Sequence, residues 1–135
     1  MHVNGSCHCG SIQFEAEIEP DKVVICHCDD CQIMSGTAYR ISVATPRNLF
    51  HLISGVVKSY IKVGESGNRR KMVFCADCGS HLYATNAESD DIISIRVGTL
   101  SERKELIPTM QVWCRSALPW AKNIQAIPGF DKQKI

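Results

Sequence analysis

The chain has 135 residues, of which 44% are hydrophobic, and a formal net charge of +1 at pH 7. This length suffices for one domain with a buried core. Near-balanced charge argues against the strongly basic face that nucleic-acid binding requires, and no apolar run approaches the roughly 20 residues that cross a membrane. The N-terminus lacks the charged and apolar regions of a signal peptide. We therefore expect one domain over residues 1–135, in the cytoplasm, with no membrane as partner and with nucleic acid disfavoured.

The first predicted element is a half-buried strand at residues 11–18, where Ile12, Phe14, Ala16 and Ile18 alternate with polar residues. Further strands are expected at residues 22–26, 39–44, 49–53, 56–63, 71–74, 81–84, 92–97 and 109–114. The strands at 49–53 and 56–63 are predicted to form a hairpin about Ser54 and Gly55. Residues 101–106 suit one short helical turn, and no stretch keeps a helical period over three turns. Many short strands separated by turn residues predict an all-β sandwich or open barrel.

Seven of the eight cysteines lie in three tight groups along this chain of strands. The groups are Cys7 with Cys9, then Cys26 with Cys28 and Cys31, then Cys75 with Cys78. In a reducing compartment, grouped cysteines indicate metal binding or catalysis more often than disulfides. Deprotonated sulfur ligands two or three residues apart are typical of zinc sites. We therefore predict zinc as the cofactor, with two ions per chain.

The two outer pairs, Cys7 with Cys9 and Cys75 with Cys78, supply the four ligands of a structural zinc site. A glycine follows each pair and lets the backbone turn as a metal loop requires. Such a site would join distant parts of the sheet and contribute on the order of 10 kcal/mol. One alternative is that these thiols carry no metal. Another is a redox dithiol at residues 75–78, which would need a strand–helix junction that the sequence lacks.

The central group has only three thiols, and catalytic zinc sites keep one position open for water or substrate. We therefore interpret Cys26, Cys28 and Cys31 as ligands of a catalytic zinc. The alternative is that a side chain closes the site, with five candidates: His27, Asp29, Asp30, His81 and Cys114. Binding the same ion would strain the loop at His27, which lies between two ligands. Cys114 follows an apolar pair on a predicted strand and is interpreted as a core residue.

The ordered set of motifs resembles the glutathione-dependent formaldehyde-activating enzymes, which share a domain with centromere protein V. The resemblance covers nearly the whole chain and is carried by residues 5–10, 26–31 with 35–36, 74–80 with 82, 98–100, and 115–116 with 119–120. It implies a β-tent sandwich with two zinc ions, and the two cysteine sets match the family's structural and catalytic sites. Gln111 stands where the family often has histidine, and Met72 where it commonly has a basic residue.

The resemblance also implies an activity, the condensation of glutathione with formaldehyde to S-(hydroxymethyl)glutathione, classed as a carbon–sulfur lyase reaction. A small thiol such as glutathione is then the expected partner, held as a thiolate at the open zinc site. Candidate cations for its carboxylates are Arg40, Lys58, Arg69, Arg70 and Arg115, although an ordinary surface charge is the favoured explanation of any single one of them. Candidate pocket walls are Trp113, Trp120 and Tyr60, each equally explained as a core residue.

Two other functions compete with the lyase. A zinc-stabilised binding module without catalysis would use surface patches such as the basic residues 69–71. A zinc hydrolase would activate water at the open position, but three anionic sulfurs make zinc a weaker Lewis acid than three imidazoles do. The sequence assigns no general acid or base, although His27 lies close enough to the central group to shuttle a proton.

Overall fold

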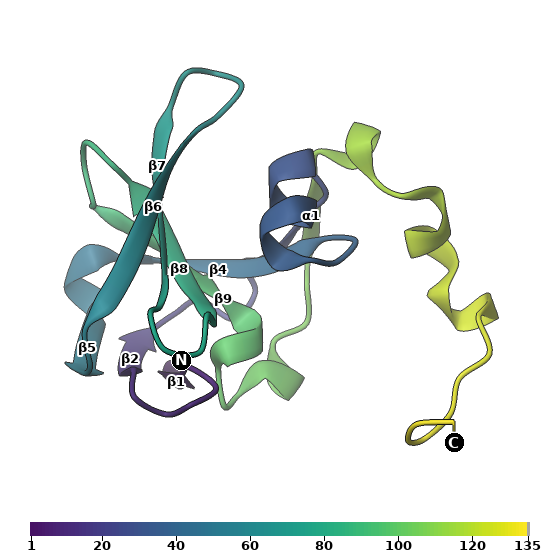
Figure 1. The fold of residues 1–135 in the computed structure, drawn as a ribbon, viewed down its shortest axis with the longest axis horizontal. Coiled ribbons are helices and arrows are strands. Elements are labelled where there is room, and N and C mark those ends of the chain that lie inside the picture. Colours follow the sequence, from purple (N-terminus) through teal and green to yellow (C-terminus); the bar gives the residue numbers. More distant parts are fainter. Residues whose placement is uncertain (135) are drawn as a thin grey trace.

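The structure is a computed structural model and describes residues 1–134 (Figure 1). A three-stranded sheet has the order β1-β2-β5, and a seven-stranded sheet has the order β10-β3-β4-β9-β8-β7-β6. The strands are β1 His2–Ser6, β2 Gln13–Glu17, β3 Val23–Cys26, β4 Arg40–Pro46, β5 Phe50–Ser54, β6 Val57–Val63, β7 Arg69–Cys75, β8 His81–Asn86, β9 Ile92–Arg96 and β10 Met110–Val112. A single α-helix, α1, spans Asp29–Ser35 within this part of the chain. The all-β prediction is confirmed.

The core lies between the two sheets and follows the predicted alternation. Phe14 and Ala16 on β2 are buried, while Gln13 and Glu17 are exposed. The ring of Phe14 lies 5.1 Å from that of Phe50, which lies 4.8 Å from that of Tyr83 on the larger sheet. These rings connect both layers through one apolar cluster. The smaller sheet thus covers one face of the larger sheet.

The predicted hairpin at residues 49–53 and 56–63 is wrong. Strand β5 pairs with β2 in the smaller sheet, and β6 pairs with β7 in the larger one. Gly55, with a φ of +91°, is the point at which the chain passes from one sheet to the other. The pattern of alternation identified both strands but contains no information about which partner each one pairs with.

Three local features are also absent from the prediction. The strand β1 was not predicted, because its second inward position is Gly5, which adds no apolar side chain to the pattern. The helix α1 was not predicted because its seven residues are too few for a helical period. The short strand β10 pairs with β3 in parallel, whereas the other strand pairs of the two sheets are antiparallel.

The end of the chain consists of short 3-10 turns. The turn at Arg103–Glu105 lies within the predicted helical turn at 101–106, which is confirmed. After β10, the turns at Cys114–Ser116 and Pro119–Ala126 lead into a segment that extends away from both sheets (Figure 1, yellow). Among residues 1–134, no helix combines the length and the apolar character needed to cross a membrane.

Gly55→Ala is expected to destabilise the fold by about 2 to 4 kcal/mol. An added Cβ would lie 2.4 Å from the carbonyl oxygen of Ser11, and the positive φ adds backbone strain. Gly67 provides a matched control, because its φ is +83° but no atom lies within 4 Å of an added Cβ. We expect Gly67→Ala to cost about 1 kcal/mol. Urea unfolding of both variants measures the difference, and equal midpoints would contradict this account of the crossing.

Candidate active site

Two cysteine clusters occupy different parts of the fold, and the first joins the two sheets. Cys7 and Cys9 lie in the loop after β1, whereas Cys75 ends β7 and Cys78 lies in the following turn. The amide of Gly10 donates to Cys7 O at 3.2 Å, and that of Gly79 donates to Cys75 O at 2.9 Å. Both glycines have positive φ, as predicted for turns of this kind. These two tight turns bring the four thiols together.

The distances within this four-cysteine cluster fit a tetrahedral zinc site. The Sγ atoms of Cys7 and Cys9 lie 3.6 Å apart, those of Cys9 and Cys75 lie 3.8 Å apart, and all four lie within 4.8 Å of one another. A tetrahedral ion with Zn–S bonds near 2.3 Å separates its sulfurs by about 3.8 Å. The chemistry and spacing of the donors therefore suit zinc.

Hydrogen bonds in this cluster favour the thiolate form that binds metals. A hydrogen bond from Ser80, joined by bonds from backbone amides of Cys9 and Ser80, lowers the pKa of Cys78 to about 5. Burial opposes ionisation of Cys7, but bonds from the amide of Ile12, at 3.2 Å, and from the Ser11 hydroxyl lower its pKa overall. The loops thus stabilise negative sulfur at Cys78 and Cys7, whereas the neighbouring thiols of Cys7 and Cys78 help to raise the pKa of Cys9.

The second cluster is built by the end of β3 and the start of α1. Cys26 is the last residue of β3, Cys28 is the N-cap of α1, and Cys31 lies in its first turn. The Cys28 sulfur accepts a hydrogen bond from the Cys31 amide at 3.3 Å, so a ligand position also initiates the helix. The three Sγ atoms lie within 4.8 Å of one another.

The charge state of this three-cysteine cluster is set by its own thiols. A hydrogen bond with Cys31 lowers the pKa of Cys26, against the effect of burial. The same bond, together with burial, strongly raises the pKa of Cys31. Cys31 therefore keeps its proton and donates it in a hydrogen bond to the Cys26 sulfur. A divalent cation in place of that proton would allow both sulfurs to ionise.

The five candidates for a fourth ligand do not complete this cluster. Within residues 1–134, its group of His, Cys, Asp and Glu ligand atoms contains only the three cysteines. His27 is buried and its Nε2 donates to Oε1 of Gln111 at 2.7 Å. Asp30 accepts from Nζ of Lys62 at 2.8 Å, and the ring of His81 stacks on Phe74 at 6.2 Å. Gln111, a departure from the family pattern, is therefore the direct partner of His27.

The prediction that Cys114 is a core residue is wrong, because its side chain is exposed. Trp113 has a φ of +56°, which ends the strand at Val112 and turns the chain into a 3-10 helix. Cys114 therefore lies beyond the last paired residue, and its side chain no longer follows the alternation of β10.

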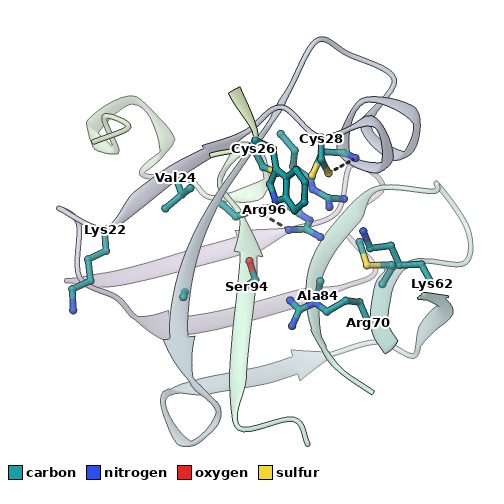
Figure 2. A pocket seen from close by; sticks show the side chains of 15 residues that line it. Lys22, Val24, Cys26, Cys28, Lys62, Arg70, Ala84, Ser94 and Arg96 are labelled. Carbon is teal, nitrogen blue, oxygen red and sulfur yellow. Dashed lines mark hydrogen bonds between the residues drawn. The ribbon is translucent and has the colours of Figure 1, made fainter. Parts of the chain in front are cut away.

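A cavity of about 360 Å³ opens beside the three-cysteine cluster (Figure 2). The side chains that line it from the large sheet include Ser42, Ala44, Ala84 and Ser94, whose small size leaves space above the strands. A second cavity, of about 730 Å³, adjoins it around the 63–68 loop. Cys28, Lys62, Arg70 and Trp113 line both cavities.

Some predicted pocket residues lie at these cavities and others do not. Arg40 and Arg70 line the smaller cavity, Arg115 lines the larger one, and Trp113 lines both. Lys58, Arg69, Tyr60 and Trp120 line neither cavity. The structure adds Lys62 and Arg96, which were not predicted. A signal for Arg96 existed, because it is the one charged residue in the mainly aliphatic strand at 92–97.

The positive side chains at the smaller cavity have a measurable consequence at His81. Burial lowers the pKa of His81 below its ordinary 6.5, and the charges of Arg96 and Arg40 lower it further. The unfolded chain therefore binds this proton more readily, so His81 reduces stability as pH falls below 6.5. Arg40→Gln should raise the pKa of His81, as measured by NMR titration of the imidazole resonances. Arg69→Gln is the control and should leave it unchanged; equal shifts in both variants would contradict this assignment.

The structure defines a class of protein with three features. It has a two-sheet β fold, a cluster of four cysteines that joins the sheets, and a cluster of three cysteines beside a cavity. The family model of glutathione-dependent formaldehyde-activating enzyme matches residues 2–116, and the chain belongs to this family. An uncharacterized lyase of Schizosaccharomyces pombe is 30% identical over 81 residues, which are 58% of this chain and 54% of that protein. This chain thus spans about half the length of that relative.

The fold is also similar to that of a solved protein. A crystal structure of a Rhodobacter sphaeroides protein superposes with a TM-score of 0.62 at 18% sequence identity. The match covers 83% of this chain and all of that one. At this level of identity, the likeness concerns the fold alone.

Proposed function

We propose that this chain is a zinc-dependent carbon–sulfur lyase that acts on a thiol–aldehyde adduct such as S-(hydroxymethyl)glutathione. Cys7, Cys9, Cys75 and Cys78 hold a structural zinc, and Cys26, Cys28 and Cys31 hold a catalytic one. Family membership and the lyase-named relative support the reaction class. The observation that carries the proposal is the contrast between the clusters: four sulfurs converge in one, and three converge beside a cavity in the other.

Zinc at the three-cysteine cluster, when bound, supplies positive charge and an open coordination position at which a thiol ionises. The cavity beside the three thiols gives a small thiol and an aldehyde room to meet. In the synthetic direction, the thiol releases its proton to solvent, its sulfur bonds to the aldehyde carbon, and the carbonyl oxygen takes up a proton. In the lyase direction, the carbon–sulfur bond breaks and the same protons return. No electron donor or acceptor is needed.

Exchange NMR of glutathione and formaldehyde with the zinc-loaded protein tests the proposal. The protein should accelerate formation and breakdown of S-(hydroxymethyl)glutathione over the protein-free rate, and Cys28→Ser should remove the acceleration. Cys114→Ser is the matched control, because Cys114 is an exposed cysteine outside both clusters. A wild-type protein with two bound zinc ions and no acceleration would contradict the lyase and favour the binding module instead.

A further inference from the structure

Arg96 is a buried cation at the cavity whose charge lacks a carboxylate partner within residues 1–134. Its exposed fraction is 7%, and it lines the smaller cavity from the end of β9. Its Nη1 donates to Oγ of Ser42 at 2.7 Å, while its buried Nε has no hydrogen-bond partner among the described residues. Burying a charge without an ion pair is costly. The position is therefore suited to an anion that enters the cavity.

Two further arginines lie beside Arg96 on the same face of the sheet. Ser42 pairs with Arg96 across β4 and β9. Arg40 lies two residues before Ser42 and is therefore the diagonal neighbour of Arg96, at the backbone separation of about 7 to 8 Å that is typical of such pairs. A buried nitrogen of Arg40, Nη1, also has no partner in the described chain. Arg70 reaches the same cavity from β7, and Figure 2 shows Arg70 and Arg96 in the pocket that Cys26 and Cys28 border.

The cavity wall carries a strong excess of positive charge. No aspartate or glutamate lines it among the described residues, and its two lysines are paired, Lys62 with Asp30 and Lys22 with Glu19. Burial, together with the positive charge of Arg40, lowers the pKa of Arg96 to about 9. Burial and the charge of Arg40 lower the pKa of Arg70 as well. The three guanidinium groups therefore repel one another and would be stabilised by a shared anion.

The cysteines balance only part of this charge. With zinc bound, three thiolates and one divalent cation would leave one net negative charge, and three guanidinium groups would exceed it by two positive charges. An entering thiolate reduces the excess to one positive charge. One further carboxylate on the same molecule would neutralise the site, and the planar fork of arginine matches a carboxylate in geometry.

We propose that Arg40, Arg70 and Arg96 form a carboxylate-binding subsite beside the three-cysteine cluster, so that the preferred thiol carries a carboxylate on its own carbon chain. As a statement about the substrate, the inference rests on the proposed thiol-binding function. As a statement about an anion site, it rests on the arginines alone. Two matched experiments separate these two statements.

The first experiment compares 3-mercaptopropionate with its methyl ester by isothermal titration calorimetry on the zinc-loaded protein. The ester has the same thiol and nearly the same shape but no charge. We expect the acid to bind at least about tenfold more tightly, because charge-assisted hydrogen bonds are lost in the ester. Arg40→Gln and Arg70→Gln should each weaken the acid about tenfold and leave the ester unchanged.

Arg69→Gln is the matched control for these variants. Arg69 neighbours Arg70 on β7 but lines neither cavity, and its Nη1 pairs with Glu88 at 2.7 Å. This substitution should alter neither affinity. Equal affinities for acid and ester, or equal losses in the Arg69 and Arg70 variants, would overturn the subsite.

The second experiment uses propionate, which has the carboxylate but no thiol. Titrated into the same protein, it should shift the Nε–Hε resonance of Arg96 in NMR spectra and raise the pKa of His81, which the arginines now lower. If propionate acts this way but neither thiol binds, the subsite stands and the lyase proposal fails. If both thiols bind equally and propionate shifts neither signal, the subsite is overturned and thiol binding stands. If nothing binds, both proposals fail.

Discussion

Cys75→Ser should yield a protein that binds one zinc ion fewer than the wild type and shows no cooperative unfolding transition. Cys75 is buried at the end of β7, and its sulfur belongs to the cluster that joins the two sheets. A structural zinc contributes about 10 kcal/mol or more, which is comparable to the whole stability of a domain of this size. Losing one sulfur ligand therefore removes most of the free energy of unfolding.

Metal analysis and thermal circular dichroism of the Cys75 variant measure this effect. Cys114→Ser serves as control, since the thiol it removes is exposed and outside both clusters, and it should keep the wild-type transition. A Cys75→Ser protein that melts cooperatively within a few degrees of wild type would show that this cluster does not hold the fold together.

The second large effect is expected for Cys28→Ser, which should lose the other zinc ion and all acceleration of the thiol–aldehyde reaction while keeping the fold. Serine is a hard, neutral oxygen ligand that replaces thiolate poorly at zinc. As the N-cap of α1, however, serine accepts the helix amide at least as well as cysteine does. The change in the free energy of unfolding should therefore stay below about 2 kcal/mol.

Zinc content, urea unfolding and the exchange rate of the glutathione adduct are measured together for this variant. The comparison with Cys75→Ser is decisive, because the two clusters are assigned different roles. A Cys28→Ser protein that unfolds as completely as Cys75→Ser would make the three-cysteine cluster a structural site and remove the basis of the lyase proposal.

The cysteine clusters were predictable from the sequence because their composition is local. Each pair or triplet is at most six residues long, and short spacing constrains its thiols whatever the rest of the fold does. That Cys7 and Cys9 meet Cys75 and Cys78 is a long-range statement, and it followed from the need of zinc for four ligands and from the family resemblance. The structure brings the four sulfurs within 4.8 Å of one another. Their role as ligands stays a prediction.

What the sequence did not reveal depended on pairing partners and local backbone geometry. The alternation of apolar and polar residues located β5 and β6. It could not predict that the chain passes from one sheet to the other at Gly55, because alternation does not specify which strands pair. The helix at α1 depends on a cysteine acting as N-cap, which is outside the usual capping residues. Cys114 was placed in the core because the strand was extended past Trp113, where the backbone turns.

The arginines of the cavity illustrate the same limit at the candidate site. Cys26 pairs with Arg40 across β3 and β4, and Ser42 pairs with Arg96 across β4 and β9. These registers bring residues 14 and 54 positions apart in the chain to one face. No local pattern contains that information, although a single arginine in a mainly aliphatic strand marks a position that needs a partner.

Zinc X-ray absorption spectroscopy with selenoglutathione tests most directly whether the two clusters differ. The spectrum of the protein loaded with two zinc ions should gain a zinc–selenium distance, with an average of one selenium atom for every two zinc ions. The reason is that one zinc ion binds selenoglutathione, whereas the other is surrounded by four cysteines. The signal should vanish in Cys28→Ser. Two bound zinc ions with four protein ligands each, and no zinc–selenium distance at saturating selenoglutathione, would contradict the account.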